Sequence, residues 1–253
     1  MSGMLQALRG VRVGLALSGG AVRGLAHIGV IKALDEAGIR PSFVTGTSAG
    51  SLVGAALAAG KDWREIAAMA RAVFWPGLLN GPRLERFCAK HLPETFAHLS
   101  LPFAAVATAV PSKRTVVINE GQLASAVSAS CAIPRLRRPV SRDGMRLLDG
   151  GISCVLPVLA CRELGAEFVV ASDVWEVSSL LRAAGCHPHH EIRGRAYPFH
   201  YREAVGHADL LVHPAVPLSG YVPGPAAVER MIKAGEQAAH RALSRLTLGP
   251  PAA

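Results

Sequence analysis

The apolar positions at the start of the chain predict two successive strand–turn–helix units. Residues 11–17 are a short apolar run that ends in a Ser-Gly-Gly turn, which is typical of a buried strand. Leucine or isoleucine then recurs at every third position within residues 23–37, which predicts a helix that ends at Gly38. Residues 42–48 and 49–60 repeat this strand and helix. Two such units in succession indicate a parallel sheet with helices on its faces.

The rest of the chain continues to alternate between strand and helix patterns, with an irregular stretch late in the sequence. Further strands are predicted at residues 103–110, 114–118, 135–140, 145–148, 167–174 and 208–214. Further helices are predicted at residues 62–73, 83–92, 121–132, 157–164 and 226–246. Neither a repeat nor a long linker divides the chain. We therefore expect one domain over residues 8–246 with a short tail at 247–253, built as three α/β/α layers around a mostly parallel sheet.

The composition is that of a globular protein with a substantial core. The chain has 253 residues, of which 50% are hydrophobic and 5% aromatic. No apolar run reaches the roughly 20 residues of a membrane span, and we identify no signal peptide. Five cysteines without a C-x-x-C pair indicate neither a disulfide framework nor a zinc site. We expect reduced cysteines, a cytoplasmic location with peripheral membrane contact as an open alternative, and no metal or cofactor.

The net charge of +9 is partly concentrated in one arginine-rich segment, residues 135–146. This segment is either a solvated hairpin or a surface that attracts anionic phosphates of a membrane or a nucleic acid. Aromatic residues are not interleaved with the arginines, so we do not expect a nucleic-acid partner. No oligomeric state follows from the sequence.

The first stretch with chemical potential is the glycine-rich turn "LSGGAVRG", residues 17–24. A turn between a strand and a helix leaves backbone N–H groups pointing into one concavity, which suits an anion. The turn lacks the Lys-Ser/Thr of a nucleotide-binding P-loop, and Ala21 replaces the middle glycine of a dinucleotide fingerprint. A tight turn without a ligand remains the alternative.

The second stretch places Ser48 between Gly46 and Gly50 in "GTSAG", after an apolar strand and before a helix. This pattern is typical of a nucleophile elbow, in which a sharp turn exposes the serine hydroxyl. The third stretch is "LLDGGI", where Asp149 follows two leucines and precedes Gly150 and Gly151. A partly desolvated carboxylate there suits a general base, and an aspartate that caps a turn is the alternative.

Taken in order, and with "SASCAIPRLRRPV" between the second and the third, these stretches resemble the patatin-like phospholipase family over residues 11–157. The resemblance implies hydrolysis of a lipid or fatty-acyl ester by a serine–aspartate dyad, with Ser48 as nucleophile and Asp149 as base. It also implies an oxyanion hole formed by the amides of Gly19, Gly20 and Ala21, with Arg23 beside it. The remaining glycines of the motifs support these turns, namely Gly24, Gly46, Gly50, Gly150 and Gly151.

This sequence departs from the family at Ala21 and Val22, where the usual residues are Gly-Ala. If the position needs a positive φ, alanine costs about 1–2 kcal/mol of backbone strain. A protein that binds an anion or a lipid without catalysis is therefore one alternative. A Ser-Asp-His hydrolase that uses His207 or His213 is another.

Two further groups of residues allow a functional and a structural interpretation. Trp63, Phe74 and Trp75 either form an apolar rim that meets lipid or pack in the core. The histidines of residues 187–191 are either a metal tract or part of an ordinary loop, and we favour the loop because no second cluster completes a site.

Overall fold

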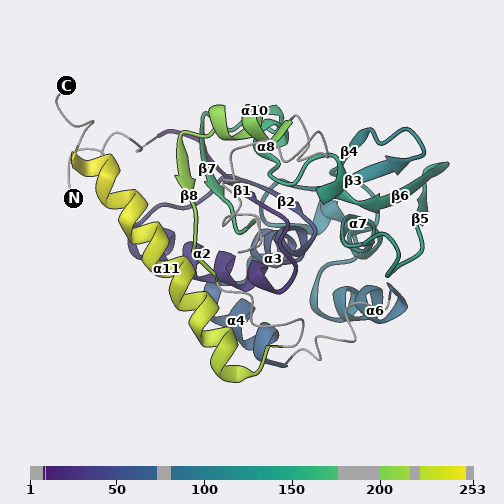
Figure 1. Ribbon diagram of the computed structural model, residues 1–253, viewed down its shortest axis with the longest axis horizontal. Helices are drawn as coiled ribbons and strands as arrows, with labels where there is room; N and C mark the ends of the chain where they lie inside the picture. Colours follow the sequence, from purple (N-terminus) through teal and green to yellow (C-terminus); the bar gives the residue numbers. More distant parts are fainter. Residues whose placement is uncertain (1–7, 9, 73–80, 176–199, 217–222, 249–253) are drawn as a thin grey trace, which may run out of the picture.

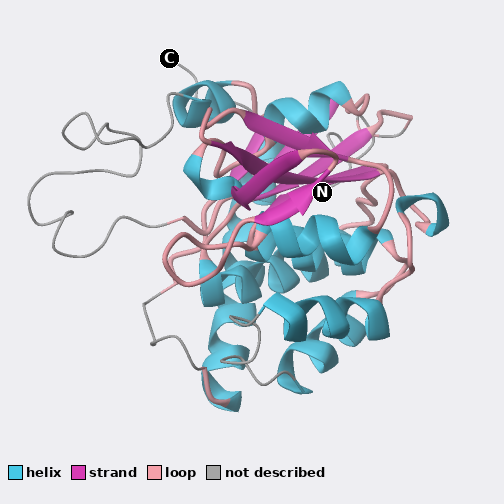
Figure 2. Cartoon of the chain, turned by 90° about the vertical axis from the view of Figure 1, so that its right-hand side faces the viewer, coloured by secondary structure: helices cyan, strands magenta, loops and turns pink. Residues whose placement is uncertain are grey.

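The computed structural model describes residues 8, 10–72, 81–175, 200–216 and 223–248. These residues form a central eight-stranded sheet between two layers of helices (Figures 1 and 2). The strands are β1 (Val13–Leu17), β2 (Phe43–Thr47), β3 (Phe103–Val110), β4 (Thr115–Ile118), β5 (Val140–Arg142), β6 (Met145–Asp149), β7 (Phe168–Ser172) and β8 (Leu210–Val212). The α/β fold class predicted from the sequence is confirmed.

The helices connect these strands and cover both faces of the sheet. The α-helices are α2 (Ala26–Glu36), α3 (Ala49–Ala58), α4 (Trp63–Ala72), α6 (Gly81–His91), α7 (Leu123–Ser130), α8 (Val158–Glu163), α10 (His200–Gly206) and α11 (Pro225–Leu248). The described residues also form three short 3-10 helices: η1 (Ala21–Leu25), η2 (Phe96–His98) and η3 (Gly150–Ile152). Among the described residues, no helix combines the length and the apolar character that crossing a membrane requires.

The order of the strands is β5-β6-β3-β2-β1-β7-β8, with β4 also paired to β3. The strands from β8 to β3 run parallel, whereas β4, β5 and β6 pair antiparallel. Strand β2 pairs with residues 103–106 of β3, β6 pairs with residues 107–110, and β4 pairs with residues 105–108. A strand has two edges, and β4 pairs with residues of β3 that β2 and β6 also use. Strand β4 must therefore occupy one edge of β3, and β2 and β6 share the other edge, where they meet end to end. Their last residues therefore face each other at the middle of β3.

The core lies on both faces of the sheet because successive side chains of a buried strand point in opposite directions. Leu15 and Leu17 of β1 pack with α2, α3 and α11, whereas Ala16 packs with α8 and α10 on the other face. Helix α11 lies along α2 (Figure 1), and two glycines allow this approach. A Cβ on Gly29 would lie 1.8 Å from the Ile232 oxygen, and one on Gly235 would lie 1.8 Å from the Ala26 oxygen.

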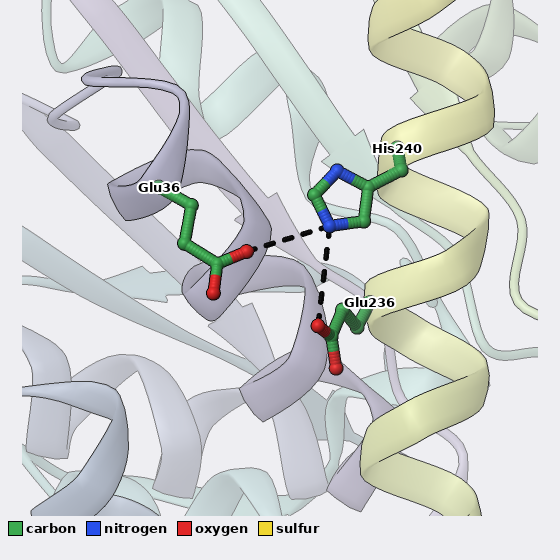
Figure 3. A group of neighbouring side chains, drawn as sticks. All are labelled: Glu36, Glu236 and His240. Atoms are coloured by element: carbon green, nitrogen blue, oxygen red, sulfur yellow. Dashed lines mark ion pairs between the residues drawn. The ribbon is translucent and has the colours of Figure 1, made fainter.

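A group of charged side chains also joins α2 to α11, and three of its members are drawn in Figure 3. His240 Nε2 lies 3.4 Å from a Glu36 oxygen and 3.9 Å from a Glu236 oxygen. The Lys32 ammonium lies 2.7 Å from the same Glu236 oxygen, and this bond raises the pKa of Lys32. Because the Lys32 ammonium also lies 3.8 Å from a Glu36 oxygen, we interpret the cluster as an ion-pair network between helices.

Two segments differ from the sequence-based prediction, each for a local reason. Residues 135–140 were predicted as a strand, but β5 begins only at Val140. Arg135 adopts a positive φ of 68°, and Pro139 has no N–H for a sheet ladder. Helix α10 was not predicted, since its seven residues are too few for a clear period.

Candidate active site

Ser48 follows the last residue of β2 and precedes helix α3. Its backbone angles, φ 53° and ψ −121°, lie in a region that costs a non-glycine residue about 1–3 kcal/mol. The two neighbouring glycines make this turn sterically possible. A Cβ on Gly46 would lie 2.3 Å from the Gly50 oxygen, and a Cβ on Gly50 would lie 2.3 Å from the Leu17 oxygen. The strained turn that the sequence predicts around Ser48 is thus present.

The Ser48 hydroxyl donates a hydrogen bond of 2.7 Å to Oδ2 of Asp149, the last residue of β6. Both residues are only 7% exposed. The other carboxylate oxygen, Oδ1, accepts a 2.8 Å bond from the Gly151 N–H. Burial raises the pKa of Asp149 to about 6, and the bonds from Ser48 and Gly151 partly oppose this rise. At neutral pH the carboxylate is therefore ionised and more basic than an exposed one, which suits proton abstraction.

Ser130, the last residue of α7, holds the elbow in place and was not identified from the sequence. Its hydroxyl accepts a 2.8 Å bond from the Ser48 N–H and donates a 2.6 Å bond to the Val106 oxygen. The side chain is fully buried. Ser130 belongs to a helix of small residues, "LASAVSAS". Such a sequence is typical of a packing helix, so nothing in it indicated a role for Ser130 in the site.

The neighbouring backbone fixes Asp149 from the opposite side. Its N–H donates to the Ala132 oxygen at 2.9 Å, and its own carbonyl oxygen accepts from the Thr108 hydroxyl at 2.9 Å. Gly150 permits the close approach to β3, since a Cβ there would lie 2.2 Å from the Val106 oxygen. The segment from Ser130 to Ala132 therefore touches both members of the pair.

The glycine-rich turn lies beside the elbow, because a Cβ on Gly19 would lie 3.5 Å from the Ser48 Cβ. The Gly19 N–H donates to the Val155 oxygen at 2.9 Å. The amide expected from the sequence as a third oxyanion donor is thus engaged elsewhere. In the described part of the chain, no acceptor is bonded to the N–H of Gly20 or Ala21. These two amides are the candidates that remain.

Ala21 adopts a φ of 51°, so the positive φ considered from the sequence is present and the strain falls on alanine. The Arg23 N–H donates to the Gly20 oxygen at 3.1 Å, which closes the turn, and the Arg23 side chain is 9% exposed. Gly24 lets η1 pack against α3, since a Cβ there would lie 2.6 Å from the Ala49 Cβ.

His27 bonds to the backbone at the start of the glycine-rich turn. It is fully buried, and burial lowers its pKa to about 4, so the ring is neutral. Nε2 lies 2.9 Å from the Ser18 oxygen and Nδ1 lies 2.8 Å from the Ser172 hydroxyl. Because a carbonyl only accepts, Nε2 carries the proton. The bonds tie the ends of β1 and β7 together.

In the described part of the chain the Ser48 hydroxyl bonds to Asp149 and to no histidine, so the histidine alternative receives no support. His213 Nδ1 lies 3.4 Å from an Asp173 oxygen, and His207 is exposed beyond the end of α10. Trp63 is partly buried against the core, with Lys32 and Arg64 over its ring. The predictions for Phe74, Trp75 and the histidines of 187–191 lie outside the described residues.

Comparison with known proteins places these features in a family. The family model described as patatin-like phospholipase matches residues 15–162. The chain is 33% identical over 173 residues to an uncharacterized NTE family protein of Mycobacterium tuberculosis, covering 63% of this chain and 48% of that protein. It is also 33% identical over 192 residues to human patatin-like phospholipase domain-containing protein 6, covering 68% of this chain and 14% of that protein. The chain thus spans about half or less of these relatives.

Solved structures show the same fold at low sequence identity. VipD from Legionella pneumophila has a TM-score of 0.60 at 14% identity, over 92% of this chain and 66% of that one. The type III effector protein ExoU has a TM-score of 0.54 at 15% identity, over 94% of this chain and 54% of that one. With the family model covering more than half of its residues, the chain belongs to the patatin-like phospholipase family.

Proposed function

We propose that this protein is a lipid acyl hydrolase that cleaves carboxylic esters through an acyl-enzyme on Ser48. The observation that carries the proposal is the 2.7 Å hydrogen bond between the strained Ser48 hydroxyl and the buried Asp149 carboxylate. Membership of the patatin-like phospholipase family supports a lipid substrate. One relative, 33% identical over 190 residues, is named lysophospholipase NTE1 of Coccidioides immitis, although the match covers 12% of that protein.

In the first half of the reaction, Asp149 takes the proton of the Ser48 hydroxyl while Oγ attacks the ester carbonyl. The carbonyl oxygen becomes an oxyanion, which the amides of Gly20 and Ala21 stabilise. Removing a single donor of this kind typically costs about 2.7–4 kcal/mol of transition-state stabilisation. The ester C–O bond then breaks, protonated Asp149 returns the proton to the departing alcohol oxygen, and the acyl group stays on Ser48.

In the second half, Asp149 removes a proton from a water molecule that attacks the acyl carbonyl. The same amides stabilise the second oxyanion. The bond between Ser48 Oγ and the acyl carbon breaks, Oγ recovers the proton from Asp149, and the fatty acid leaves. Every proton and electron pair is thus handled by Ser48, Asp149, the turn amides and water.

Ester cleavage by point variants tests the proposal. Purified wild type, Ser48→Ala, Asp149→Asn and the exposed control Ser141→Ala are assayed on p-nitrophenyl esters of increasing chain length, then on phospholipids and lysophospholipids. We expect the first two variants to lose turnover and the control to retain it. A fluorophosphonate probe should label wild type and not Ser48→Ala. Wild-type turnover in both dyad variants would overturn the proposal.

A second candidate function, binding of an anionic or lipid ligand without catalysis, is favoured by one observation. Ala21 occupies a positive-φ position of the turn where glycine is unstrained. The same ester series separates the two functions. Absence of turnover at every chain length, together with retained lipid binding, would favour this second function.

A further inference from the structure

Residues 131–139 join α7 to β5 (both labelled in Figure 1), and they expose a large apolar side chain among arginines. Leu136 is 57% exposed, compared with 37% for Val117, the other exposed large apolar residue of the described chain. Arg135 and Arg138 are exposed as well. We call Arg135, Leu136 and Arg138 the basic tip.

The basic tip follows, along the chain, a residue that is bonded to the candidate active site. It lies a few residues after Ala132, whose carbonyl accepts the Asp149 N–H. The N–H groups of Leu136 and Arg137 both donate to the Ile133 oxygen, at 3.2 and 2.9 Å, which folds the segment into a tight turn. The Arg137 side chain points back and donates to the Ser128 oxygen at 3.0 Å and to the Ser128 hydroxyl at 2.7 Å. One arginine thus anchors the turn and leaves the basic tip exposed.

The backbone of Arg135 adds a second observation. Its φ of 68° lies in the left-handed region, which glycine adopts without strain and arginine does not. A side chain kept in a strained position points to a use for that side chain. Leu136 beside it is the most exposed large apolar side chain of the described residues.

We propose that the basic tip docks this protein on an anionic lipid bilayer and so presents the Ser48–Asp149 site to lipid. Arginine is attracted to anionic headgroups and can lay its methylene stem along apolar surface, while leucine inserts at the boundary of the acyl chains. The net charge of +9 favours the same partner. The delivery of substrate rests on the proposed function, whereas the docking itself does not.

Vesicle flotation measures the docking without hydrolysis when every protein carries Ser48→Ala. The vesicles are phosphatidylcholine with or without phosphatidylserine. We expect the parent to bind only the vesicles that contain phosphatidylserine, with binding that weakens as salt rises. The double variant Arg135→Gln/Arg138→Gln should lose about 30-fold in affinity, from the usual contribution of two arginines near an anionic surface. Leu136→Ser should also weaken binding.

Two comparisons separate docking from folding. Arg135→Gly relieves the positive φ, so we expect a melting temperature no lower than that of the parent, together with weaker vesicle binding. The double variant Arg40→Gln/Arg241→Gln removes two arginines that are exposed elsewhere and should bind vesicles like the parent. Equal losses in this control, or unchanged binding in every tip variant, would overturn the proposal.

The docking and the proposed function fail in different ways. With Ser48 restored, the tip variants should cleave a soluble short-chain ester like wild type and should lose cleavage of vesicle lipid. Vesicle binding without cleavage of any ester would leave the docking standing and contradict the proposed function. Cleavage of soluble esters without vesicle binding would contradict the docking alone. Binding of a single-stranded oligonucleotide through the basic tip in preference to the vesicles would also contradict it.

Discussion

Ser130→Ala perturbs the candidate site without touching either member of the dyad. It removes the acceptor of the Ser48 N–H and the donor to the Val106 oxygen, and it places a methyl group in a fully buried position. Each buried polar group left without a partner costs about 1–3 kcal/mol, so we expect about 2–6 kcal/mol of lost stability. The strained turn at Ser48 also loses the bond that holds its N–H, and a nucleophile displaced by about 1 Å can cost on the order of 100-fold in rate.

The assay combines thermal unfolding with kcat and KM on a soluble ester, and Ser128→Ala is the matched control. Ser128 is a fully buried serine on the same helix, and its hydroxyl accepts from Arg137 instead of holding Ser48. We expect Ser130→Ala to lower kcat strongly with little change in KM, and Ser128→Ala to lower stability with nearly normal kcat. Wild-type kcat in Ser130→Ala, or an equal loss of kcat in both variants, would refute the reasoning.

The remaining predictions concern Asp149, the glycine-rich turn and the helix pair. Because Asp149 must be ionised and its pKa is about 6, kcat/KM should rise between pH 5 and pH 7 with an apparent pKa near 6. Because the pKa of Asp149 is raised in the folded protein, this residue stabilises the fold below the usual aspartate pKa near 4, and the contribution is lost as pH rises through about 6. The free energy of unfolding of Asp149→Asn, measured against pH, should therefore lack this fall between about pH 4 and 6. Ala21→Gly should keep turnover and leave stability equal or up to about 1 kcal/mol higher, since it removes a strained φ of 51°; a melting scan and the ester assay check this. Gly235→Ala should lower stability by about 1–3 kcal/mol, because its Cβ would lie 1.8 Å from the Ala26 oxygen, whereas Gly206→Ala has space and should melt like wild type.

The central strands followed from the sequence because their signals are local, whereas Asp149 was singled out only by the family resemblance. The step-of-three apolar residues before Gly38 mark a helix, and the glycines beside Ser48 mark a turn that only small residues allow. That Ser48 and Asp149 touch does not follow from their spacing of 101 residues. It depends on β2 and β6 sharing one edge of β3, which is a property of the pairing register.

Features that depend on distant partners were missed for the same reason. The Gly19 amide looked free in the turn, but its acceptor, Val155, lies far along the chain. Ser130 gave no signal, because its role rests on bonds to two other segments. The strand predicted at residues 135–140 was expected as one arm of a hairpin around the turn at 141–144, and it failed because the sequence carried no information on the left-handed φ of Arg135.

Trapping the acyl-enzyme tests the central claim most directly. The protein is mixed with a p-nitrophenyl ester, quenched in acid during turnover, digested and analysed by mass spectrometry. We predict that the acyl group is found on Ser48 in the wild-type protein and is absent from Ser48→Ala. Sustained turnover with an unmodified Ser48, or an acyl group that accumulates on another residue, would contradict the account.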